Sequence, residues 1–357
     1  MKYYLISGET SGDQHTAELI NAIRTKDPHA QFRGMGGDAC LSKGMELVIH
    51  QKEMAVMGFW EVIKQLPKIS RVLRLIKKDI VSFEPDRVVL VDYPGFNLRI
   101  AKFAKKNSFA VHYYIAPKVW AWKEKRIKTI KKWVDHLYCI LPFEEEYFTK
   151  AGINAHYVGN PSKSKVKAYS KPESSATKTI AILPGSRKQE ITSNLNTMLN
   201  LKNDFEEYQF IVSQAPGFDS AFYHKLDPNL ELESDMYKLL ASADLAIVTS
   251  GTATLETALF RVPQIVCYKT SSLTYILAKL FVKVKYISLV NLILDKALIP
   301  ELIQSDFNTK RMTYELNKFR NINLTEDLLE GYQDLYTKLG NQDPSDNVSE
   351  HLCKAET

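Results

Sequence analysis

Two short segments combine glycine with small hydroxyl side chains in the way that phosphate-binding turns do. In the first, Asp244–Thr249 is rich in apolar and β-branched residues, as a buried parallel strand is, and Ser250-Gly251-Thr252 adds a tight turn and a helix start. The free N–H groups and positive dipole end of such a helix favour a phosphate or diphosphate. Glu256, one turn further, could accept hydrogen bonds from ribose hydroxyls. An ordinary strand–turn–helix is the alternative.

The second segment is Gly185-Ser186-Arg187, which follows another predicted strand, Thr179–Leu183. In a doubly wound sheet both strands end near the point where the strand order reverses, so the two turns would face one crevice. Arg187 could neutralise a diphosphate through its fork of donors. A surface arginine is the alternative, but two phosphate-suited turns in one domain favour an anion site.

Acidic residues follow strands predicted in the first half of the chain. Glu9 and Asp13 lie in a loop after the first strand, Asp92 directly follows a later strand, and Asn97 comes five residues after Asp92. The first loop has no lysine, so it is neither a Walker loop nor a dinucleotide fingerprint. Carboxylates here could hold sugar hydroxyls or act as a general base, and Asp92 would suit deprotonation of an acceptor hydroxyl. Helix capping by Asp13 and turn formation by Asp92 are the alternatives.

Apolar and aromatic residues stand next to basic ones in two places. We interpret the segment 54–60 as an exposed apolar patch suited to lipid. The regular spacing from Val62 to Ile80 predicts a core helix with a solvated basic side. Trp120 and Trp122 lie among lysines and arginines, which could indicate nucleic acid. Because they are close to a strand end, we expect them to fill space between domains, and no nucleic-acid partner is predicted. The residues predicted to form the patch are Met54, Val56, Met57, Phe59 and Trp60.

Length and composition indicate a soluble globular protein. A chain of 357 residues with 45% apolar and 25% charged residues is expected to form two domains, and the net charge of +6 does not choose a partner. The scattered cysteines match no metal-ligand spacing and indicate reduced cytosolic thiols. No apolar run reaches the ~18–20 residues of a membrane span, so membrane association would be peripheral. We expect domains at 1–165 and 178–308, a linker at 162–178, and a helical segment with a disordered end at 309–357.

Taken together, these segments resemble the lipid-A-disaccharide synthase family, inverting glycosyltransferases of Gram-negative bacteria. The similarity runs in order from residue 3 to about residue 310. It is most specific in three blocks, which read MAVMGFWEVI at 54–63, PKVWAWKEKRIKTI at 117–130 and SGTATLE at 250–256. Further matching blocks read SGETSGD at 7–13, DYPGFN at 92–97, LPFEEEYF at 141–148, LPGSRKQEI at 183–191 and YISLVNLIL at 286–294.

The resemblance implies an α/β protein of GT-B-like fold, with two Rossmann-like domains, a cleft between them and a helical C-terminal segment. It implies transfer of 2,3-diacylglucosamine from its UDP conjugate to the 6-hydroxyl of 2,3-diacylglucosamine 1-phosphate, giving a β-1′,6-linked disaccharide and UDP, without a metal or cofactor. It also implies a cytoplasmic protein, peripheral on the inner face of the inner membrane, and allows a homodimer. Residues 185–187 and 250–252 would hold UDP with Glu256, while Asn97, Trp120, Trp122 and the apolar patch would hold the acceptor and its lipid.

The sequence departs from the family pattern at two positions. The usual D-x-P-D-F-N has Gly95 in place of its second acid, so the role of base would pass to Asp92, Asp13 or Glu9, and we select Asp92. Lys118 replaces a usual serine, and the sequence gives no interpretation of it. Two other functions stay open. One is another UDP-sugar enzyme of the same fold, such as a UDP-N-acetylglucosamine 2-epimerase, and the other is a non-enzymatic basic protein that binds membrane or RNA.

Overall fold

The computed structural model describes residues 1–54, 66–167, 169, 177–271, 275 and 284–354. The chain forms two compact units. Residues 1–161 and 341–357 make up the first, and residues 162–340 make up the second. The second unit is therefore an insertion within the first, and the chain passes between the units twice.

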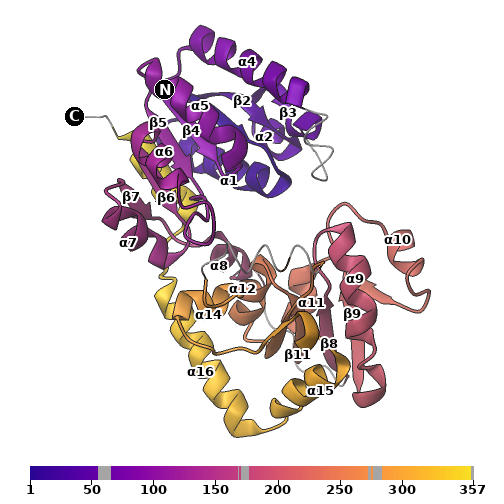
Figure 1. Cartoon of the computed structure of the whole chain (residues 1–357). Coiled ribbons are helices and arrows are strands. Elements are labelled where there is room, and N and C mark those ends of the chain that lie inside the picture. The colour runs from indigo at the N-terminus through magenta and orange to yellow at the C-terminus, as the bar shows by residue number, and fades with distance from the viewer. Residues whose placement is uncertain (55–65, 168, 170–176, 272–274, 276–283, 355–357) are drawn as a thin grey trace. The chain divides into compact units, whose positions relative to one another are not determined.

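The first unit is built on a seven-stranded sheet whose pairs are all parallel, in the order β3-β2-β1-β4-β5-β6-β7 (Figure 1). The order reverses between β1 and β4. Its strands are β1 (Lys2–Ser7), β2 (Gln31–Gly36), β3 (Glu46–His50), β4 (Arg87–Val91), β5 (Val111–Tyr114), β6 (His136–Cys139) and β7 (Ala155–Tyr157). Its helices are α1 (Thr10–Lys26), α2 (Asp38–Ser42), η1 (Gln51–Met54), α4 (Leu66–Phe83), α5 (Pro94–Lys106), α6 (Arg126–Trp133), α7 (Pro142–Lys150) and α17 (Pro344–Cys353).

Both faces of this sheet are covered, which explains why its central strands read as continuous apolar runs. Tyr4 and Ile6 point to a core shared with α4, α5 and α6, whereas Tyr3 and Leu5 point to a core shared with α1 and α17. Helix α4 buries Val72, Leu73, Ile76 and Ile80 and exposes Lys68, Arg71, Arg74 and Lys78. The predicted core helix with a solvated basic side is therefore confirmed for the part that lies within the described residues.

The second unit repeats the design with six parallel strands in the order β10-β9-β8-β11-β12-β13, which reverses between β8 and β11. Its strands are β8 (Lys178–Leu183), β9 (Tyr208–Ser213), β10 (Glu231–Glu233), β11 (Leu245–Thr249), β12 (Gln264–Tyr268) and β13 (Glu301–Ile303). Its helices are α8 (Pro161–Val166), α9 (Lys188–Leu199), η2 (Lys202–Asp204), α10 (Ser220–His224), α11 (Met236–Ser242), α12 (Thr252–Leu259), α14 (Leu289–Leu294), η3 (Gln304–Asp306), α15 (Thr309–Lys318) and α16 (Ile322–Lys338).

The two Rossmann-like sheets agree with the predicted fold class, but the disordered end was a wrong prediction. Helix α17 is ordered because Asp343 caps its first amides and Val348 and Leu352 are buried beside Tyr3 and Leu19. The start of the expected linker is also helical, as α8. No helix in the described ranges is long and apolar enough to cross a bilayer.

Candidate active site in two parts

In the first unit, Asp92 occupies the carboxyl end of β4, beside the point where the strand order reverses. Asp92 and Tyr93 both have left-handed backbones, with φ of 46° and 48°. Non-glycine residues adopt this region rarely, and they are enriched at functional sites. The turn is held from β5, because the Asp92 N–H donates to the Tyr114 carbonyl over 2.9 Å and the Tyr113 hydroxyl donates to the Asp92 carbonyl.

The side chain of Asn97 stabilises this turn through hydrogen bonds. Its side chain is fully buried, and Nδ2 lies within 3.3 Å of the Ile6 carbonyl, 3.2 Å of the Val91 carbonyl and 2.8 Å of the Asp92 carbonyl. It therefore joins the ends of β1 and β4. This placement supports a structural role for Asn97 rather than the predicted contact with an acceptor.

The electrostatic surroundings of Asp92 suit a general base. Burial is the main cause that raises the pKa of the Asp92 carboxyl, and the negative charge of Glu9 raises it further. Three groups lower this pKa and so oppose the rise, namely Lys118, the Tyr93 amide and His15. A carboxylate whose pKa is raised binds a proton more strongly and is a better base. Glu9 itself is exposed at the N-cap position of α1 and makes no capping bond with its side chain.

Asp13 has a different environment from Asp92. Its side chain is only 3% exposed, and its carboxylate accepts from the amides of Gly37, Ala39 and Cys40 at 2.6, 3.0 and 3.2 Å. These amides belong to the start of α2, which has unpaired N–H groups like every helix start. The geometry favours the capping alternative for Asp13, although the capped helix is α2 and not the one that Asp13 itself occupies.

The two tryptophans predicted for the acceptor differ in exposure. Trp120 donates from Nε1 to the Oε1 of Glu144 over 2.9 Å, and Glu144 is buried. Burial raises the pKa of Glu144 to about 7, although the bond from Trp120 works against this rise. Trp122 is 50% exposed and carries Lys123 over its ring at 4.2 Å. Of the two, Trp122 is the more exposed.

The predicted exposed patch is wrong at Met54, the one member within the described residues. Met54 is buried because η1 turns its side chain into the core with Ile49, Val72 and Leu73. The other predicted members, Val56, Met57, Phe59 and Trp60, lie outside the described residues.

In the second unit, Ser250, Gly251 and Thr252 connect β11 to α12 next to the strand reversal. The Ser250 hydroxyl donates to the Ile287 carbonyl over 2.8 Å, and its amide donates to the Cys267 carbonyl over 2.9 Å. The turn is thus fixed from two sides, and Gly251 stands as the N-cap residue. Since α12 begins at Thr252, its first amides face the carboxyl end of the sheet, where α/β proteins bind phosphates.

The turn of Gly185, Ser186 and Arg187 follows β8, the neighbour of β11. Gly185 has φ of 118°, and an added Cβ would lie 2.6 Å from the Cβ of Glu190, so glycine is required. Glu190 accepts from the amides of Ser186 and Arg187, and its Oε1 lies 3.0 Å from the Arg187 guanidinium. Glu190 was missed in the sequence, although a glutamate three residues after a helix start signals a capping box. The Arg187 side chain is still 82% exposed and therefore accessible to an anion.

Glu256 is buried on α12 and held by two hydroxyl groups. Its Oε1 accepts from Tyr237 over 2.6 Å and from Ser162 over 3.2 Å. Tyr237 in turn stacks with Tyr169 at 5.3 Å between ring centroids. The carboxylate of Glu256 is thus oriented by Tyr237 of α11 and by Ser162, the first residue of the unit. The sequence did not indicate either contact.

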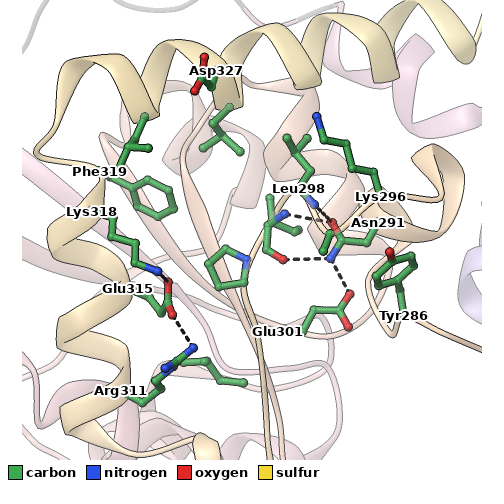
Figure 2. Close-up of a pocket in the computed structure, with 16 residues that line it drawn as sticks. Tyr286, Asn291, Lys296, Leu298, Glu301, Arg311, Glu315, Lys318, Phe319 and Asp327 are labelled. Atoms are coloured by element: carbon green, nitrogen blue, oxygen red, sulfur yellow. Dashed lines mark hydrogen bonds and ion pairs between the residues drawn. The ribbon is translucent and has the colours of Figure 1, made fainter.

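A cavity of about 620 Å³ lies elsewhere in the second unit, between β13 and the helices α15 and α16 (Figure 2). Its polar walls are paired internally. Glu315 meets Arg311 and Lys318 at 2.8 and 2.7 Å, and Glu301 accepts from Asn291 over 2.9 Å. None of the predicted site residues lines this cavity.

Solved structures identify the fold class. A glycosyltransferase of kitacinnamycin matches with a TM-score of 0.68 at 11% identity, covering 98% of each chain. A UDP-GlcNAc 2-epimerase from Neisseria meningitidis, bound to UDP-GlcNAc, matches with a TM-score of 0.65 at 12% identity, covering 99% of this chain and 98% of that one. The chain therefore has the GT-B fold.

Sequence relatives identify the family. Residues 3–343 match the family model described as Lipid-A-disaccharide synthetase. The lipid-A-disaccharide synthase of Syntrophus aciditrophicus is 39% identical over 87% of this chain and 86% of its own length, and that of Myxococcus xanthus is 35% identical over 98% and 96%. The chain belongs to the lipid-A-disaccharide synthase family and is a glycosyltransferase. The epimerase alternative is not favoured, because epimerases share only the fold.

Proposed function

We propose that this enzyme transfers 2,3-diacylglucosamine from its UDP conjugate to the 6-hydroxyl of 2,3-diacylglucosamine 1-phosphate, with Asp92 as the base. The base assignment rests on the partly buried Asp92 carboxyl, which lies on a constrained turn at the strand reversal and has a raised pKa. Asp13 is occupied by three amides, which leaves Glu9 as the alternative base.

Asp92 takes the proton of the acceptor hydroxyl while the oxygen of that hydroxyl bonds to the anomeric carbon of the donor sugar. The bond from this carbon to the diphosphate breaks, with inversion at the carbon. The leaving UDP gains negative charge. Arg187 and the first amides of α12 stabilise that charge, and Glu256 binds the ribose hydroxyls. None of these proposed steps requires a metal ion.

The first test is an assay of the purified chain in detergent micelles with both lipid substrates, measuring UDP and disaccharide. Asp92→Asn should lower kcat by roughly 100-fold or more, as loss of a general base does. Glu9→Gln should cost less, and Glu330→Gln, at an exposed acid on α16, should have no effect. Nearly full kcat in the Asp92 variant would exclude Asp92 as the base. Absence of UDP release from the unaltered enzyme would contradict the function itself.

Peripheral membrane binding belongs to the same proposal. On α4, Leu75 and Val81 are 43% and 48% exposed and share the solvent side with Lys68, Arg71 and Arg74. Apolar and basic side chains together suit anionic headgroups and acyl chains. Sedimentation with anionic vesicles, but not with neutral ones, is the expected result. Analytical ultracentrifugation of the full chain tests the homodimer.

A further inference from the structure

Glu301, the first residue of β13, holds the part of the chain that leads into α14. Its Oε2 accepts from the Ile287 amide over 2.9 Å. Its Oε1 accepts from the Ser288 amide and from the side chain of Asn291, each over 2.9 Å. Because donors occupy both carboxylate oxygens, the start of α14 is fixed to the last strand of the second sheet.

Asn291 in turn fixes the position of Glu301. Asn291 is only 1% exposed, and its Nδ2 donates to the Ile299 carbonyl over 2.9 Å as well as to Glu301. Its Oδ1 accepts from the amides of Leu298 and Ile299 at 2.9 and 3.0 Å (Figure 2). The Glu301 carboxylate therefore lines the cavity of Figure 2 but is used for bonds inside the protein.

The turn with the proposed UDP-binding role is attached to the same part of the chain. The Ile287 carbonyl accepts from the Ser250 hydroxyl over 2.8 Å. Two residues further, the Leu289 amide donates to the hydroxyl of Thr254 over 3.3 Å, and this hydroxyl donates to the Gly251 carbonyl over 2.8 Å. Ser250 is thus attached directly, and Gly251 is attached through Thr254.

A single peptide group connects Glu301 to Ser250. The N–H of Ser288, which donates to Glu301, and the C=O of Ile287, which accepts from Ser250, belong to the same peptide bond. A trans peptide group is planar, and its N–H and C=O point in opposite directions. Glu301 therefore fixes the direction of the carbonyl to which the Ser250 hydroxyl donates. Without this acceptor, the peptide group would be free to rotate and to release the turn.

We propose that Glu301 is a positioning residue, which acts through this peptide group to keep the Ser250 turn in the shape that binds the diphosphate of UDP. The inference rests on the proposed role of the turn. It makes a prediction of specific sign. A direct effect of the Glu301 charge on a diphosphate would be repulsive, so neutralising the charge would strengthen binding. Positioning predicts that the same change weakens it.

The test compares UDP affinity, by calorimetric titration, in the unaltered enzyme and in Glu301→Gln. The NH₂ group of a glutamine cannot accept a hydrogen bond, so one of the two amides loses its acceptor and binding should weaken by roughly ten-fold. Glu315→Gln is the matched control. Glu315 lines the same cavity and pairs with Arg311 and Lys318, and among the described residues it has no bond to the segment 287–289. This control should bind UDP like the unaltered enzyme.

A double variant shows whether Glu301 acts through Ser250. If it does, Glu301→Gln combined with Ser250→Ala should bind UDP about as weakly as Ser250→Ala alone. An additive loss would overturn the inference, because Glu301 would then act independently of Ser250. Urea unfolding verifies that each variant is folded. If Glu301→Gln does not fold, Glu301→Asp replaces it, since aspartate keeps the charge but withdraws both oxygens by one methylene group.

Hydrogen exchange in the ligand-free protein separates this inference from the proposed function. The amides of residues 249–256 should exchange faster in Glu301→Gln than in the unaltered chain, and Glu315→Gln should leave their rates unchanged. Unchanged rates in Glu301→Gln overturn the inference. Faster exchange with normal UDP affinity in both Glu301→Gln and Ser250→Ala supports the positioning of the turn and contradicts only its role in binding UDP.

Discussion

Tyr237 donates its hydroxyl hydrogen to Glu256 over 2.6 Å, so a residue on α11 fixes the orientation of the carboxylate on α12. The second bond, from Ser162, reaches the same oxygen. Oε1 is therefore occupied by protein donors, so in the proposed role of Glu256 the ribose hydroxyls would bind to Oε2.

Replacing Tyr237 by Phe should weaken binding of the UDP sugar by roughly ten-fold, because a hydrogen bond to a charged group contributes about 1.5–3 kcal/mol. Calorimetric titration with UDP measures the effect. Tyr169→Phe is the matched control, since its hydroxyl bonds to Asp235 and not to Glu256. Equal affinity in the Tyr237 variant and the unaltered enzyme would show that the bond does not position Glu256.

Asp13→Asn should act on stability. The three amides that donate to Asp13 are buried or partly buried, and the NH₂ group of an asparagine would face one of them, so we expect a loss of about 2 kcal/mol in the free energy of unfolding. Urea unfolding gives this value. Asp92→Asn should unfold like the unaltered chain. If instead Asp13→Asn unfolds normally but loses kcat, Asp13 belongs to the chemistry.

Restoring an acid at position 95 should be tolerated. Gly95 is exposed in the first turn of α5, and a Cβ added there would meet no atom within 4 Å. A carboxylate near a helix N-terminus is favourable by about 0.3–1 kcal/mol. In the Asp92→Asn background, Gly95→Asp should recover part of the lost kcat, while Gly95→Asn should not. Equal rates in the two double variants would mean that an acid at position 95 cannot reach the acceptor.

A row of histidines makes the first unit sensitive to acid. The ring of His112 stacks on that of His136 with 4.8 Å between the ring centroids, and the ring centroids of His156 and His351 of α17 are 4.7 Å apart. Burial lowers the pKa values of His112, His156 and His351, and neighbouring positive charges lower them further.

Through these three histidines the unfolded chain binds more protons than the folded one as the pH falls below about 6.5, so their contribution to stability is lost below this pH. Glu144, whose pKa burial raises to about 7, acts in the opposite direction, so the histidine contribution is read from the comparison of variants. Urea unfolding at pH 7.5 and pH 5.5 should show the difference, and His351→Phe should reduce it. A pH dependence that is the same in the His351 variant would exclude this histidine as a source.

Periodicity and turn chemistry predicted the elements that are long or clearly bounded. Strands β1, β4, β8 and β11 are apolar runs that end at turn residues, and buried strands must have both properties. The three-residue strands β7, β10 and β13 were not predicted, since each is too short to show a pattern. The disordered end was mispredicted because α17 is stabilised by partners in α1, far away in the sequence.

For the site, the sequence indicated candidate turns but not the contacts that hold them. Asn97 reads as a ligand-binding amide, whereas its bonds go to three main-chain carbonyls. Asn194 has a similar structural role in the second unit, because its side chain bonds to Pro184 after β8 and to Thr249 of β11. The neighbouring residues in the sequence do not indicate these contacts. Such contacts depend on tertiary structure, which a local pattern does not encode.

The insertion of the second unit within the first has a consequence for the order of synthesis. Helix α17 covers the side of the first sheet that includes Tyr3 and Leu5, yet residues 162–340 are translated before it. At about 5–20 residues per second, the part of that side that α17 covers stays open for roughly ten seconds or longer on the ribosome, with only α1 packed beside it. During this time the exposed apolar surface of the nascent first unit can bind chaperones or aggregate. Once α17 has been translated and packs on this surface, the surface is covered.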